Sequence, residues 1–83
     1  MDSQKFIDKC KLLVADYHNQ NSDEKITYND VYVVWSTKVL QNNKALLSTP
    51  VSDGKYYEVT HNGDKREIYF DAYKKEKNLF FEV

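Results

Sequence analysis

The segment from Lys55 to Phe70, KYYEVTHNGDKREIYF, has the sequence of a β-hairpin. Its centre, Asn62-Gly63, is the residue pair preferred in two-residue type I′ turns, in which both central positions need a positive φ. A two-residue loop would fix which residues of the two strands lie opposite each other. The resulting pairs are His61 with Asp64, Val59 with Arg66, and Tyr57 with Ile68.

This register also predicts the two faces of the hairpin, because successive side chains of a strand point to opposite sides. One face carries an apolar set, which is Tyr57, Val59, Ile68 and Phe70. The other face carries a mixed set, which is Tyr56, Glu58, Thr60, Lys65, Glu67 and Tyr69. We expect the apolar set to face the protein core.

An amphipathic helix is predicted from about Ser3 to His18, with Asp2 or Ser3 as its N-cap. Its apolar residues recur with the helical period and form one stripe. They are Phe6, Ile7, Cys10, Leu13, Val14 and Tyr17. The polar residues 19–24, NQNSDE, have no periodicity and are expected to form an exposed loop.

Two more strands are predicted at residues 30–40 and 44–49, joined by a turn at Asn42-Asn43, and Ser52-Asp53-Gly54 forms a further turn. In the first of these strands Val31, Val33, Trp35 and Val39 would face the helix, unless the register slips by one residue. The residues expected to face away are Tyr32, Val34, Lys38 and Leu40.

Short turns favour an antiparallel meander, and the helix carries the other large apolar stripe. The expected fold is therefore α+β, with one N-terminal helix packed on a four-stranded antiparallel sheet. The last residues, 78–83, read either as a short fifth strand or as a tail folded onto an apolar surface.

The composition is that of one small domain of 83 residues with a nearly neutral charge, 12 Lys and Arg against 13 Asp and Glu. That balance argues against a protein that coats polyanions. There is no apolar run long enough for a membrane span, no secretion signal and a single cysteine, so we expect a cytoplasmic protein.

Several segments resemble a family of small, uncharacterised proteins from phages and prophages of Gram-positive bacteria. The resemblance is carried by residues 30–35 (DVYVVW), Lys38, residues 40–42 (LQN) and 44–49 (KALLST), and by later segments. The later segments are YYE at 56–58, NGDK at 62–65 and DAYKK at 71–75. The resemblance implies a bacterial host and implies no activity, cofactor or site residue.

The sequence indicates neither a catalytic site nor a metal site. Cys10 lies on the apolar stripe, where a buried thiol is inert, and His18 suits the last turn of a helix. His61 would flank the hairpin turn beside Asp64, and no nucleophile is placed within reach of that pair. No residues recur at the spacing of metal ligands, and the two glycines are used in turns. We therefore predict no enzyme activity, no metal and no cofactor.

Three kinds of binding remain as hypotheses. The preferred one is a protein partner, because tyrosines are enriched at interface hot spots and an uncompensated acidic pair invites Lys or Arg. Its residues are Tyr32, Tyr56, Glu58, Glu67 and Tyr69, with Tyr56 expected opposite Tyr69 and Glu58 opposite Glu67.

The alternatives use other residues. A nucleic-acid-binding module would combine cations with an aromatic ring, and its residues are Lys65, Arg66, Tyr73, Lys74 and Lys75. A homo-oligomer, for example a dimer, would associate through an apolar cluster near the end of the chain. That cluster is Leu79, Phe80, Phe81 and Val83.

Overall fold

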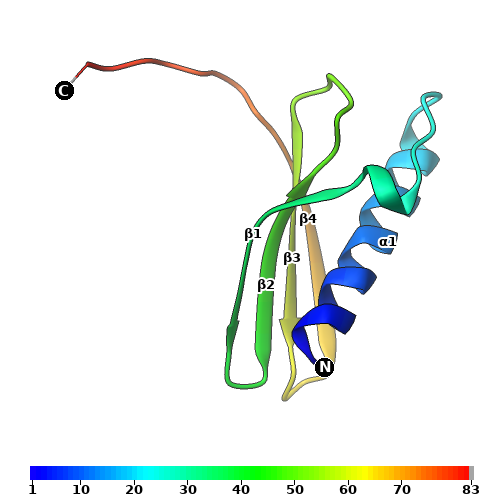
Figure 1. Cartoon of the computed structure of the whole chain (residues 1–83), viewed down its shortest axis with the longest axis vertical. Helices are drawn as coiled ribbons and strands as arrows, with labels where there is room; N and C mark the ends of the chain where they lie inside the picture. The colour runs from blue at the N-terminus through cyan, green and yellow to red at the C-terminus, as the bar shows by residue number, and fades with distance from the viewer. Residues whose placement is uncertain (83) are drawn as a thin grey trace.

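One helix lies across one face of a four-stranded antiparallel sheet in the computed structural model, which describes residues 1–82 (Figure 1). The strand order is β1-β2-β3-β4, so the predicted α+β meander is confirmed. The elements are α1 (Ser3–Asn21), the 3-10 helix η1 (Tyr28–Asp30), β1 (Tyr32–Val39), β2 (Asn42–Ser48), β3 (Lys55–Asn62) and β4 (Glu67–Lys74). Neither of the helices found in residues 1–82 is long and apolar enough to cross a membrane.

The helix begins as its sequence predicts. The Asp2 carboxylate accepts a hydrogen bond from the backbone N–H of Lys5 at 2.8 Å, which satisfies one of the free donors of the first turn. Its apolar stripe faces the sheet, with Phe6, Cys10 and Val14 fully buried and Ile7, Leu13 and Tyr17 partly buried against them.

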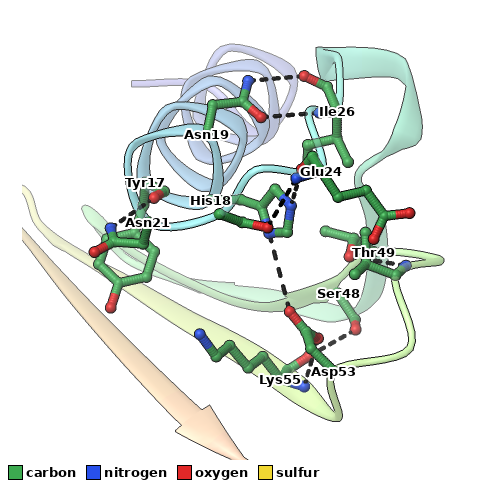
Figure 2. A network of polar contacts seen from close by, with 12 residues as sticks. Tyr17, His18, Asn19, Asn21, Glu24, Ile26, Ser48, Thr49, Asp53 and Lys55 are labelled. Carbon is green, nitrogen blue, oxygen red and sulfur yellow. Dashed lines mark hydrogen bonds and ion pairs between the residues drawn. The ribbon is translucent and has the colours of Figure 1, made fainter.

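The helix ends three residues later than predicted, at Asn21 instead of His18, and the segment after it is held by side chains (Figure 2). The side-chain amide of Asn19 donates to the carbonyl of Ile26 and accepts from its N–H, both at 2.8 Å. The buried His18 ring contacts the carbonyl oxygen of Glu24 through Nε2 at 2.6 Å. Residues 19–24 are therefore only partly the exposed loop that their composition suggests.

The inner face of the sheet, which we define as the face that packs on α1, holds the core. Ala45 and Leu47 of β2 and Tyr57 and Val59 of β3 are all fully buried. The Tyr57 ring lies 5.9 Å from that of Tyr17 and 5.7 Å from that of Phe70, a spacing typical of attractive aromatic pairs. The helix thus packs mainly over β2, and to a lesser and similar extent over β1 and β3.

The register of the β3–β4 hairpin differs from the prediction. Tyr57 lies opposite Ala72 and Val59 opposite Phe70, each four residues further along β4 than a two-residue loop would allow. The turn spans residues 63–66, and its positive φ falls on Arg66 (55°) instead of Gly63. Because the shift is an even number of residues, the side chains within the paired strands keep their predicted faces. Lys65, which was expected on the mixed face, lies in the turn instead.

A contact between the two hairpins explains why Gly63 does not form the tight turn. A Cβ on Gly63 would lie 2.3 Å from the carbonyl oxygen of Gln41, so the chain passes against the β1–β2 turn there. The N–H of Gly63 also donates to Asn42 Oδ1, and the Asn62 side chain accepts from the N–H of Lys65. Glycine is needed at this position for close approach between segments.

The first hairpin also departs from the prediction. Its turn is Leu40-Gln41 instead of Asn42-Asn43, and Asn43 is buried in β2. A bulge at Val34 shifts the register between Val33 and Trp35, which adds one residue and inverts the alternation beyond it. Trp35 and Val39, expected on the inner face, therefore point outward.

The same bulge moves Lys38 to the inner face. Lys38 was expected to face away from the helix, but it lies opposite the buried Asn43, and its ammonium donates to the carbonyl of Met1 at 3.5 Å. Tyr32, which precedes the bulge, keeps its predicted outward position and lies opposite Ser48.

His61 is a residue of the inner face and not a surface residue of the turn. It lies opposite Ile68 instead of Asp64 and is 8% exposed. Its Nδ1 lies 3.4 Å from the amide nitrogen of Asn43, a donor, and its ring lies 6.3 Å from that of Phe6. The contact between His61 and Asp64 that the sequence suggested is absent among the described residues.

Cys10 is fully buried, and this burial raises the pKa of its thiol to about 12. We expect Cys10 to resist thiol reagents until the protein unfolds. Between pH 9.0 and about 12 the unfolded chain has lost the thiol proton while the folded chain keeps it. Unfolding then releases a proton, so the free energy of unfolding should fall as the pH rises above about 9.

The measurement is denaturant unfolding at increasing pH, with Cys10→Ala as the control. The alanine variant lacks the titrating thiol, so its stability should fall less steeply over this range. Parallel pH profiles for the two proteins would contradict the assignment.

Candidate functional site

The candidate site is the outer face of the sheet, which is the face turned away from α1. No segment within residues 1–82 covers it. Lys75 is still hydrogen-bonded to Gly54, and residues 76–82 then run away from the sheet (Figure 1). Leu79, Phe80 and Phe81 are exposed, with Phe80 at 87%. The described part of the tail forms neither the fifth strand nor the cover that the sequence allowed.

An acidic–aromatic patch, which we define as Tyr56, Glu58, Tyr69, Asp71 and Tyr73, occupies the β3–β4 half of this face. Tyr56 lies opposite Tyr73 and Glu58 lies opposite Asp71. The pairs expected from the sequence, Tyr56 with Tyr69 and Glu58 with Glu67, are therefore wrong, because they depended on the two-residue loop. The kind of surface is unchanged, since an acidic pair still lies between tyrosines.

The three carboxylates of the outer face differ in their partners. Lys44 Nζ lies 3.5 Å from Glu58 Oε1, so a lysine of β2 compensates Glu58. Glu67 accepts a hydrogen bond from the Tyr69 hydroxyl, and this bond is the main reason that the pKa of Tyr69 is raised. Asp71 forms no ion pair with any residue among 1–82. The uncompensated charge of the patch therefore resides on Asp71.

Apolar side chains extend the patch across the sheet. One cross-strand row runs from Trp35 through Leu46 and Glu58 to Asp71, so the indole shares the row of the acidic pair. Trp35 is 42% exposed and Tyr73 is 53% exposed. Tyr32 and Tyr56 line a hollow of about 210 Å³ at the tail end of this face. The outer face thus combines large aromatic side chains with a carboxylate, Asp71, that has neither an ion pair nor a side-chain hydrogen bond among residues 1–82.

Sequence reasoning missed two members of this face, Trp35 and Asp71. The signal for Trp35 was the run from Val31 to Trp35, which is continuously apolar and so does not alternate as a strand with one solvated face should. Asp71 lies two residues from both Tyr69 and Tyr73 along β4, so the three side chains share a face. Its pairing with Glu58 was missed because the length of the loop was predicted wrongly.

The residues proposed for nucleic-acid binding do not come together. Lys65 and Arg66 lie in the β3–β4 turn, whereas Tyr73, Lys74 and Lys75 lie at the other end of β4. Seven residue steps of about 3.3 Å separate the two ends of the strand. Tyr73 also belongs to the patch that contains Asp71.

The self-association residues Leu79, Phe80 and Phe81 are exposed and close together in the chain. Val83, the fourth residue proposed for this role, lies outside the described residues. In residues 1–82 no group of three or more His, Cys, Asp or Glu side chains has the geometry to hold a metal ion.

Comparison with known proteins bears on ancestry. The search of curated proteins and the search of solved structures gave no match. A family match covers residues 7–83, which include all four strands and α1 except its first turn. The match extends beyond the segments at 30–75 that carry the sequence resemblance, and the matched family is, as expected, an uncharacterised one. The chain belongs to the family of unknown function DUF6275.

Proposed function

We propose that this chain is an accessory protein of phage type, which acts in the cytoplasm of a Gram-positive bacterial host by binding another protein and performs no chemistry of its own. The observation that carries the proposal is Asp71, an uncompensated carboxylate between Tyr69 and Tyr73 on a sheet face that the described chain leaves uncovered. The phage origin and the bacterial host rest on the sequence resemblance.

The chemistry of the patch favours a partner that presents an arginine or lysine beside apolar side chains. A guanidinium would pair with Asp71 and stack on the neighbouring tyrosine rings, which attract cations. Trp35 and Leu46 would receive the apolar part of the partner. Tyrosine and tryptophan supply large contact areas at a low cost in conformational entropy, so this half of the face has the composition of a hot spot.

The charge reversal Asp71→Arg tests the proposal. Capture from a lysate of the host identifies candidate partners, and the test itself is the dissociation constant measured with a purified partner. We expect the variant to bind at least about thirtyfold more weakly, which corresponds to about 2 kcal/mol, because it replaces an attractive charge contact with repulsion. The wild-type affinity should also fall as the salt concentration rises.

Asp16→Arg is the matched control, because it makes the same charge change at an exposed position of α1. It should bind as the wild type does. Unchanged affinity in a folded Asp71→Arg variant, or equal losses in the two variants, would refute the assignment of binding to this face.

A further inference from the structure

The start of α1 and both hairpin turns lie at one end of the molecule (Figure 1). Residues from these segments line a groove of about 510 Å³. Lys38, His61 and Ile68, three inner-face residues, line one part of it. Leu40 and Arg66, from the two turns, line another part, together with Met1. The groove is separate from the acidic–aromatic patch, and so a result obtained there is independent of the proposed function.

The charges that line the groove are of one sign. Arg66 and Lys38 contribute two cations and His61 an imidazole, and no Asp or Glu lines the groove. Neither Arg66 nor Lys38 forms an ion pair within residues 1–82. Asp2, which follows Met1 in the chain, is not among the lining residues, and its carboxylate caps α1. The groove is therefore electropositive and complementary to an anion.

The backbone around the groove is unusual at two positions. Leu40 (φ 56°) and Arg66 (φ 55°) are the two non-glycine residues in the described chain with a positive φ, and both line the groove. Such positions favour Gly or Asn, because a Cβ is strained there. Leu40 is in addition 83% exposed. The stability of the turns does not account for a leucine at position 40 or an arginine at position 66. Residues with a strained backbone cluster at functional sites.

The walls of the groove are held in place before any ligand binds. Gly63 packs against Gln41, and its N–H donates to Asn42, so the two turns that carry Arg66 and Leu40 are fixed against each other. His61 is anchored between Asn43 and Phe6. A preformed site loses less conformational freedom on binding.

We infer that this groove binds a carboxylate carried on an apolar stem. The Arg66 guanidinium matches the two carboxylate oxygens with parallel N–H donors, and Lys38 adds a second positive charge. Met1, Leu40 and Ile68 contact the stem. This arrangement gives the exposed Leu40 and the strained Arg66 a shared role.

The test uses 3-phenylpropionate as the probe, and two-dimensional NMR spectra of the full chain detect its binding. We expect saturable shifts at Arg66, His61 and Ile68. The neutral amide of the same acid should bind at least about tenfold more weakly, because it lacks the charge. Inorganic phosphate, which lacks the stem, should also bind more weakly. No saturation at about 10 mM probe, or equal binding of phosphate, would overturn the inference.

Arg66→Gly provides the decisive variant, because glycine accepts the positive φ. It should melt at the same temperature as the wild type or higher, and bind the probe at least about tenfold more weakly. Lys65→Gln, which removes a neighbouring cation outside the groove, should bind normally. Wild-type affinity in Arg66→Gly would overturn the inference.

Discussion

Replacing Tyr57 with alanine is expected to lower the free energy of unfolding by about 3–5 kcal/mol. Tyr57 is fully buried at the centre of β3, and its ring packs between Tyr17 and Phe70. A chain of this length has a total stability of about 4–12 kcal/mol. The variant should therefore be largely unfolded or marginally stable, which thermal and denaturant unfolding followed by circular dichroism will measure.

Tyr57→Phe is the matched control, because it keeps the ring and removes only the hydroxyl. That hydroxyl is buried without a hydrogen-bond partner among the described residues, and this burial is the main reason that the pKa of Tyr57 is raised. Removing an unpaired buried polar group should leave stability unchanged or raise it by about 1–3 kcal/mol. A marked loss of stability in Tyr57→Phe would contradict the structure by revealing a bond to that oxygen.

Gly63→Ala is expected to destabilise the fold by about 1–3 kcal/mol, the usual cost of forcing an extra methyl group into a packed site. Its Cβ would lie 2.3 Å from a backbone oxygen of Gln41, which cannot move aside as a flexible side chain would. The two hairpin turns must separate instead. Unfolding in urea measures the loss, and faster amide hydrogen exchange at residues 40–42 should accompany it.

Gly54→Ala separates this contact from a backbone effect. Gly54 has a φ of 69°, and a Cβ there would lie 3.7 Å from its nearest neighbour, Lys75, which is ordinary contact. The variant should lose about 1–2 kcal/mol through the strained backbone alone. Its exchange at residues 40–42 should remain normal. Unchanged stability in Gly63→Ala would show that the two turns do not pack as described.

The sequence predicted the fold class and most side-chain faces because these depend on periodicity. The apolar stripe of α1 and the inner residues Tyr57, Val59 and Phe70 follow from helical and strand repeats. The predicted face of a strand side chain stays correct when the register is wrong by an even number of residues, as it is for β3 and β4. The predicted cross-strand pairs do change with any error in register, so Asp71 was not recognised as the neighbour of Glu58.

The errors have tertiary causes. Asn62-Gly63 has the composition of a tight turn, but the packing of Gly63 on Gln41 and the Asn62 side chain favour a longer one. The bulge at Val34 reverses the direction of Trp35, and a continuous apolar run does not reveal where a bulge falls. Asn19 bonds to Ile26, seven residues away, so its role depends on a chain reversal that local composition does not encode.

The meander order has a consequence for folding kinetics. Each strand pairs with its neighbours in the chain, so the sheet can form by closing short loops. The formation of one hairpin takes about 1–10 μs. The long-range step is the docking of α1 onto the sheet, mainly onto β2, which completes the burial of Phe6 and Cys10. We expect early hairpin formation and late helix docking, so truncations of the α1 stripe should accelerate unfolding more than they slow folding.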